Sequence, residues 1–274
     1  MQSRQVSIIK ANGRSEPFDP EKLLRSLTRS GADSELAEEI ADRVASSLKG
    51  GERTRDIYAK AFTALRDAQR STAARYSVKR ALLELGPTGY PFEDFVAEIF
   101  GTRGYTTETR VMRSGRCVEH ELDMVAVRDT EMCAAEVKFH NSAGTKSDLK
   151  VALYVHARFL DIGANKDLQP INTPMLITNT KFSSHAVAYA ECVGLTLIGW
   201  DYPKKGNMRE LIEESGVHPV SCLTTLSTAR KRALMTQGIV LCRQLRANRE
   251  AMRALGMSDT SIEQVLDETQ HLCR

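Results

Sequence analysis

The sequence predicts three parts: an α+β N-terminal domain made of a β-hairpin and a helical bundle, an α/β core, and a small all-α C-terminal region. The first follows from strand-like runs on both sides of Asn12-Gly13, succeeded by amphipathic helical patterns up to residue 86. The second follows from short apolar runs that alternate with helical patterns over 87–203. From 204 to 274 the patterns are helical. We therefore expect domains at 1–86, 87–203 and 204–274.

Composition narrows the class of protein. A chain of 274 residues exceeds the usual size of one domain, and its 42% hydrophobic and 27% charged residues are ordinary for a soluble globular protein. No apolar run approaches membrane-spanning length, and the six cysteines form no CxxC pair. We expect a cytoplasmic protein with no membrane partner. The net charge of +3 permits nucleic-acid binding without demonstrating it.

Each helix of the N-terminal domain has a recognisable start. Asp19 followed by Pro20 predicts a helix that runs to Gly31, because aspartate caps helices and proline suits their first turn. Asp33 caps a second helix and Thr54 a third. A fourth covers 71–85 and ends at the breakers Gly86-Pro87.

Three segments of this domain carry a family resemblance: IIKANGRSEPFDPEKL at 8–23, TRDIY at 54–58 and AARYSVKR at 73–80. In this order they resemble the ATP-cone, a nucleotide-binding regulatory domain. The resemblance implies ATP or dATP as a regulatory ligand under a hairpin lid. A small helical docking domain with ordinary surface lysines is the alternative. The implied binding residues are Ile8, Lys10, Glu16, Asp19, Lys22, Thr54 and Tyr58.

A second hairpin, predicted over 121–127 and 132–139, carries charged residues in an apolar setting. Residues two apart on a strand share a face, so Glu136 and Lys138 project together, while Leu122, Met124 and Ala126 share a face on the first strand. Antiparallel pairing places Asp123 beside Glu136 and Lys138. Such carboxylates are costly to bury unless a cation joins them, and Mg²⁺ prefers hard oxygen ligands. A solvated hairpin with an exposed salt bridge is the plainer alternative.

The surrounding pattern sharpens this hypothesis. A helix over 90–104 places Phe92, Phe95, Val96, Ile99 and Phe100 on one stripe, and a strand follows it. Helix, strand, ExD and ExK resemble the Mrr-like branch of the PD-(D/E)XK restriction endonucleases, although Leu122 stands where the motif's name has proline. The resemblance implies a restriction-endonuclease-like core and Mg²⁺ or Mn²⁺. The resemblance also implies that Asp123, Glu136 and the Val137 carbonyl hold the metal. Glu93, Asp123, Glu136 and Lys138 are catalytic, with Glu98 as a competitor for the role of Glu93.

Further nucleic-acid contacts are predicted on two helical segments. A helix over 147–161 presents Lys150, Tyr154 and His156, although a histidine there more often packs. The C-terminal region resembles degenerate helix-hairpin-helix elements, with a helical packing or dimerisation module as the alternative. Its candidate contacts are Arg230, Lys231 and Arg232.

Together these patterns predict a metal-dependent endonuclease, regulated by ATP or dATP, that acts on nucleic acid, with double-stranded DNA as the expected substrate. The chain has no GxxxxGK[ST] loop, so nucleotide hydrolysis is not required. A symmetric homo-oligomer, a dimer or tetramer, suits the two cuts that a duplex needs. The alternatives are a nucleotide-responsive nucleic-acid-binding regulator with a non-cutting nuclease fold, and a structural adaptor.

Overall fold

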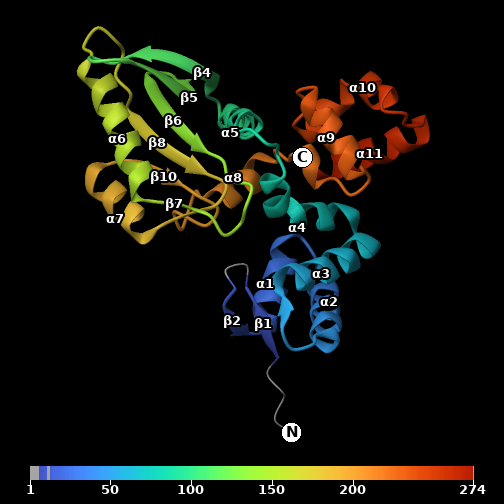
Figure 1. The fold of residues 1–274 in the computed structure, drawn as a ribbon. Helices are drawn as coiled ribbons and strands as arrows, with labels where there is room; N and C mark the ends of the chain where they lie inside the picture. The colour runs from blue at the N-terminus through green and yellow to red at the C-terminus, as the bar shows by residue number, and fades with distance from the viewer. Residues whose placement is uncertain (1–5, 11–12, 274) are drawn as a thin grey trace.

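The computed structural model describes residues 6–10 and 13–273 (Figure 1). Its N-terminal unit is a three-stranded sheet of order β2-β1-β3 beside four helices. Strand β1 pairs antiparallel with β2, as in the predicted hairpin, and parallel with β3, a strand that the sequence did not predict. The elements are β1 (Ser7–Ile9), β2 (Ser15–Pro17), α1 (Pro20–Arg29), α2 (Ser34–Ser47), β3 (Glu52–Arg53), α3 (Thr54–Ala68) and α4 (Arg70–Leu83).

The predicted helix starts hold in this unit, with one difference. Asp19 and Asp33 cap α1 and α2 by accepting hydrogen bonds from Lys22 N and Leu36 N. Thr54, predicted as a cap, is instead the first helical residue of α3, and its hydroxyl donates to the carbonyl of Ile9 at 3.2 Å. This bond ties the helix to β1. Asn12 of the predicted turn lies outside the described residues.

A five-stranded mixed sheet of order β10-β8-β6-β5-β4 forms the centre of the molecule. Helix α5 packs on one face, and α6 and α7 pack on the other (Figure 1). The elements are α5 (Tyr90–Thr102), β4 (Thr106–Ser114), β5 (Glu119–Arg128), β6 (Glu131–Lys138), β7 (Lys146–Ser147), α6 (Leu149–Ala164), β8 (Thr173–Thr178), β9 (Lys181–Phe182), α7 (Ser184–Val193) and β10 (Thr196–Ile198).

The expectation that Leu122 and Met124 lie on the same face of β5 is wrong. Met124 packs in the core beneath α5, but Leu122 packs in the core beneath α6, although the two are separated by only one residue. The cause lies in the strand ladder: β4 pairs with β5 on both sides of Arg110 and Asp123, but these two residues are not paired, and Arg110 has a left-handed φ of 57°. The sheet is therefore kinked at Asp123.

The C-terminal region is helical, as predicted, and packs against the N-terminal unit. The bonds from Ser77 Oγ to the Cys222 carbonyl, at 3.2 Å, and from Ser221 Oγ to the Ala81 carbonyl, at 2.8 Å, join it to α4. The helical pattern over 241–255 is divided into two short helices, η2 (Cys242–Arg246) and α10 (Arg249–Ala254). No helix of the described residues is long and apolar enough to cross a membrane. The elements are α8 (Met208–Ser215), η1 (Val220–Cys222), α9 (Thr228–Thr236), η2 (Cys242–Arg246), α10 (Arg249–Ala254) and α11 (Asp259–Leu272).

Candidate functional site

The kink in β5 separates this strand from β6 and leaves room for a side chain between them. Pairing between the two strands covers Met124–Arg128 and Glu131–Ala135 and does not reach Glu136 or Val137. The Val137 N–H therefore donates to Asp123 Oδ2, at 2.7 Å, rather than to a backbone carbonyl of β5. The predicted proximity of Asp123 to the ExK segment is thus present in the structure.

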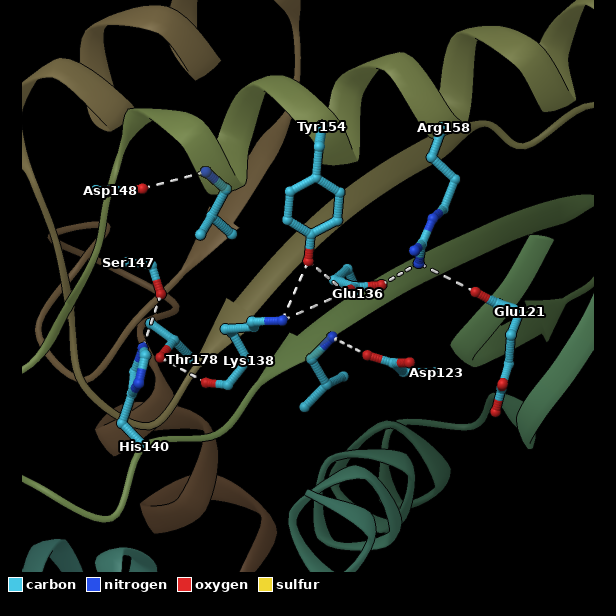
Figure 2. Close-up of polar contacts among 12 residues, drawn as sticks. Glu121, Asp123, Glu136, Lys138, His140, Ser147, Asp148, Tyr154, Arg158 and Thr178 are labelled. Carbon is cyan, nitrogen blue, oxygen red and sulfur yellow. Dashed lines mark hydrogen bonds and ion pairs between the residues drawn. The ribbon is translucent and has the colours of Figure 1, made fainter. Parts of the chain in front are cut away.

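Glu136 is buried, 6% exposed, and both of its carboxylate oxygens are engaged (Figure 2). Tyr154, on α6, donates its hydroxyl to Glu136 Oε1 at 2.6 Å, and Arg158, one turn further along, pairs with Oε2. The Lys138 ammonium lies 3.9 Å from Oε1 and donates to the Tyr154 hydroxyl at 3.2 Å. Glu136 thus has three polar partners.

Glu93 approaches the same place from α5, on the opposite side of the sheet from α6. Its carboxylate is 6% exposed, and its Oε2 lies 3.3 Å from Arg110 Nη1. Arg110 also pairs with Asp94 at 2.9 Å, so the kinked strand β4 is bound to the start of α5. Glu98, the competing candidate, points elsewhere on the same helix and pairs with Arg243.

Burial and mutual repulsion change the ionisation of two of these carboxyl groups. Burial, followed by the negative charge of Glu136, raises the pKa of Asp123 to about 6. Burial, followed by the negative charge of Asp123, raises the pKa of Glu93 to about 7. Near neutral pH this place therefore tends to hold protons or attract cations, as catalytic carboxylates do.

The donor set is chemically suited to a hard cation, with one obstacle. Asp123, Glu136 and the Val137 carbonyl are all oxygen donors, and Mg²⁺ commonly uses one or two carboxylates plus waters. In the described residues, however, no group of three or more His, Cys, Asp or Glu side chains is arranged to hold a metal. Arg158 and Tyr154 occupy the Glu136 oxygens, so a metal at Glu136 requires them to withdraw.

The predicted nucleotide-binding residues mostly surround the first hairpin. Lys10 and Glu16 face each other across it at 3.4 Å, and Thr54 joins α3 to the end of β1. Asp19 is engaged as the cap of α1, and Lys22 is exposed in the first turn of that helix. The side chain of Ile8, in contrast, is 5% exposed and packs in the core of this unit.

Tyr58 lies in a different setting from the hairpin residues. Its ring stacks on Tyr76, with centroids 5.0 Å apart, and on Phe62 at 6.0 Å. Burial raises the pKa of its hydroxyl, and this buried hydroxyl has no hydrogen-bond partner among the described residues. The structure therefore joins Tyr58 to α4 through a stack of aromatic rings.

Of the other predicted nucleic-acid contacts, three contact groups within the protein. His156 Nδ1 lies 2.7 Å from the Tyr189 hydroxyl, which fits packing between α6 and α7. Lys231 donates to the carbonyl of Ser221 at 2.9 Å. Lys150 and Arg232 are exposed, and Arg230 reaches the Gly256 carbonyl at 3.4 Å.

The sequence did not predict Arg110 or Arg158 as site residues, and it predicted Tyr154 as a nucleic-acid contact rather than as a partner of Glu136. The spacing of Tyr154 and Arg158 offers a signal, because residues four apart on a helix share a face. An amphipathic α6 packed beside an ExK strand directs that face toward Glu136. Arg110 offers no such signal, because a left-handed arginine within a strand has no sequence mark.

Comparison with known proteins identifies two segments and a relative. The ATP cone domain matches residues 6–84, and the domain described as "AF1548-like, C-terminal" matches residues 218–273. An uncharacterized protein of Archaeoglobus fulgidus is 38% identical over 176 residues, which are 64% of this chain and 98% of that protein.

One solved structure agrees with the sequence relative. The crystal structure described as that of "Protein of Unknown Function AF1548" is 36% identical, with a TM-score of 0.54 over 67% of this chain and 97% of that one. The structure of Can2 from Sulfobacillus thermosulfidooxidans with cyclic tetra-adenylate is 11% identical, with a TM-score of 0.32 over 74% of this chain and 64% of that one. A TM-score this low carries no argument. The predicted ATP-cone is confirmed.

Proposed function

This chain belongs to the AF1548-like family and carries an ATP-cone domain, and from that premise we propose that it is a metal-dependent nuclease controlled by an adenine nucleotide. The relatives are of unknown function, so the proposal depends on the site itself. A restriction-endonuclease-like assignment of the central sheet is part of the proposal.

The observation that carries the proposal is the gathering of three carboxylates at the kink of β5. Asp123 repels both Glu93 and Glu136 and is held against β6 by the Val137 N–H. Burial raises the pKa of two of these groups, Asp123 and Glu93, and buried carboxylates destabilise a fold unless a ligand uses them. A role in phosphodiester hydrolysis accounts for this arrangement.

Each residue then has a chemical role. Asp123, Glu136 and the Val137 carbonyl would hold Mg²⁺ or Mn²⁺, which when bound polarises a phosphate and lowers the pKa of a water. Lys138 places an ammonium beside Glu136, where it can orient a water and balance charge that develops on the phosphorus oxygens. Glu93, with a pKa of about 7, is able to accept or donate a proton at neutral pH.

The regulatory part of the proposal assigns ATP or dATP to the hairpin of the ATP-cone. Lys10 and Lys22 provide ammonium groups for the phosphates, and α1 presents its N-terminal N–H groups near Lys22. Nucleic acid, with double-stranded DNA first, is the proposed substrate.

A second candidate is a nucleotide-responsive nucleic-acid-binding regulator that does not cut. The pairing of Glu136 with Arg158 and Tyr154 favours it, because a carboxylate satisfied by a guanidinium and a phenol needs no metal. Cleavage separates the two candidates.

The test is cleavage of supercoiled plasmid DNA with Mg²⁺ or Mn²⁺, in the presence and absence of ATP and dATP. Asp123→Ala and Glu136→Ala should abolish cutting. Glu119→Ala is the matched control, because this exposed glutamate lies on the same strand as Asp123 and should leave cutting unchanged. Binding without cutting under either metal would favour the regulator, and cutting by Asp123→Ala would refute the ligand assignment.

A further inference from the structure

A cavity lies between the ATP-cone and the rest of the chain, apart from the carboxylates at the kink of β5 and from the first hairpin; of the predicted nucleotide-binding residues, Tyr58 lines it. Its volume is about 630 Å³, within the usual range of small-molecule sites of about 300–1,000 Å³. It is lined by the end of α1, by α4, by Trp200 and by α8. The hairpin residues Lys10, Lys22 and Thr54 are not part of its lining.

Positively charged side chains converge on this cavity from separate elements. Arg29 comes from α1, Lys79 from α4 and Arg209 from α8. Arg75 also lines it, but its guanidinium donates to the carbonyls of Ser30 and His271. Glu213 is the acidic residue of the lining, so positive charge is in excess.

Two of these cations, Lys79 and Arg209, have no close hydrogen-bonded acceptor for their charge among the described residues. The buried Nε of Arg209 has no hydrogen-bond partner in the described residues, and the carboxylate oxygens beside its guanidinium lie 3.8 Å away on Glu210, from Nη2, and 3.9 Å away on Glu213, from Nε. The ammonium of Lys79 lies over the face of the Trp200 ring, 5.3 Å from the ring centroid, in a cation–π contact. An unpartnered buried donor is costly, so the site is incomplete without an acceptor.

The ionisation of these groups agrees with a positive cavity. Burial, followed by the charges of Lys181 and Arg209, lowers the pKa of Lys79, against the opposite effect of Asp201. Burial, followed by Arg209, lowers the pKa of Arg29, and Glu213 opposes this. Like charges held together in this way favour an anion that neutralises them.

We propose that this cavity is a second anion site, which binds an oligophosphate through Arg29, Lys79 and Arg209. Phosphate oxygens supply several acceptors at once, as three separate donor groups require, and arginine suits them well. The oligophosphate is either free or the tail of a nucleotide whose ring lies against Trp200. Because α4 and α8 both line the cavity, the ligand ties the ATP-cone to the part of the chain that follows it.

Trp200 gives a local reporter, because it is the only tryptophan of the sequence. Inorganic tripolyphosphate, titrated into the full chain in magnesium-free buffer, should change the tryptophan emission saturably as Lys79 moves from the ring to the phosphate. Sodium chloride at equal ionic strength should not. An equal response to the salt would overturn the proposal as simple screening.

Variants locate the binding. Lys79→Gln and Arg209→Gln should each weaken the affinity for tripolyphosphate at least tenfold. Arg29→Gln should weaken it too, and because Arg29 is exposed, this change does not disturb buried packing. Lys22→Ala, at the hairpin, should leave the response unchanged, as should the remote control Arg43→Gln. Loss of the response in Lys22→Ala together with its retention in Lys79→Gln and Arg209→Gln would overturn the proposal.

A parallel titration with ATP in the Lys22→Ala background identifies the source of the phosphate. A tighter response to ATP than to tripolyphosphate assigns the site to a nucleotide. Equal responses assign it to the phosphates alone. No saturable response to either ligand would refute the site.

Discussion

Replacing Asp123 by asparagine should make the protein more stable at pH 8. The carboxyl group of Asp123 has a pKa raised to about 6 from an ordinary 3.8, because it is buried and lies beside Glu136. A raised pKa means that the folded state holds the proton more tightly than the unfolded state. The stabilising effect of that proton is complete below pH 4 and is lost as the pH rises through 6.

The magnitude follows from the shift. About two pKa units at about 1.36 kcal/mol each give about 3 kcal/mol by which ionised Asp123 destabilises the fold at pH 8. Asparagine keeps an oxygen that can accept from the Val137 N–H but carries no charge. We therefore expect a gain of roughly 2–3 kcal/mol at pH 8, which raises the melting temperature by about 2–4 °C per kcal/mol in a chain of this size.

The assay is thermal unfolding with a chelator at pH 4, 6 and 8. The gain should be absent at pH 4, partial at pH 6 and full at pH 8. Glu119→Gln, an exposed change on the same strand, should shift stability by less than about 0.5 kcal/mol at every pH. A variant that is no more stable than the wild type at pH 8, or equally stabilised at pH 4, would refute the reasoning.

Three further outcomes are expected. Arg158→Ala should lower the free energy of unfolding by about 3 kcal/mol, because it removes the guanidinium partner of buried Glu136, whereas Arg128→Ala, which breaks an exposed pair, should cost under about 1 kcal/mol in the same denaturant titration. Saturating ATP or dATP should raise the melting temperature by several degrees, and Lys22→Ala should remove most of that shift; an unchanged shift would remove Lys22 from the site. Glu268→Gln should destabilise the chain by about 2–3 kcal/mol, because this buried carboxylate accepts three hydrogen bonds from the 224–225 loop; a loss below about 0.5 kcal/mol would contradict it.

Local signals in the sequence predicted much of the fold. Asp19 and Asp33 are short-range helix caps, and the starts of α1 and α2 follow from them. The β5–β6 hairpin follows from two apolar runs and a polar turn. Asp123 lies beside the ExK segment, as expected, and accepts a hydrogen bond from the Val137 N–H. These features depend on residues close in the sequence.

The features that were missed depend on distant segments. Strand β3 has only two residues and is formed by pairing with β1, so no periodic pattern reveals it. The kink at Asp123 arises from the left-handed backbone of Arg110 on the neighbouring strand. Arg158 reaches Glu136 only because α6 packs across the sheet. Each requires the tertiary arrangement, which local propensity does not contain.

The position of α4 bears on how nucleotide binding would reach the carboxylates. One side of this helix packs in the ATP-cone through Ala73, while Val78 and Leu82 belong to the core shared with α5. Helix α5 carries Glu93, so a continuous packed route exists within one chain.

The last prediction concerns whether nucleotide changes the oligomeric state. The amphipathic helical faces over 54–85 suggest a surface for a nucleotide-driven oligomer, but part of α4 is covered by η1 within the same chain. An oligomer must therefore use the exposed part of α3 or another surface. Light scattering at one protein concentration, with ATP, dATP or neither, decides whether quaternary structure changes. We expect nucleotide to raise the mass. A constant mass, combined with nucleotide-dependent cleavage, would assign the coupling to the route through α4 alone, because no second chain would then be needed to carry it.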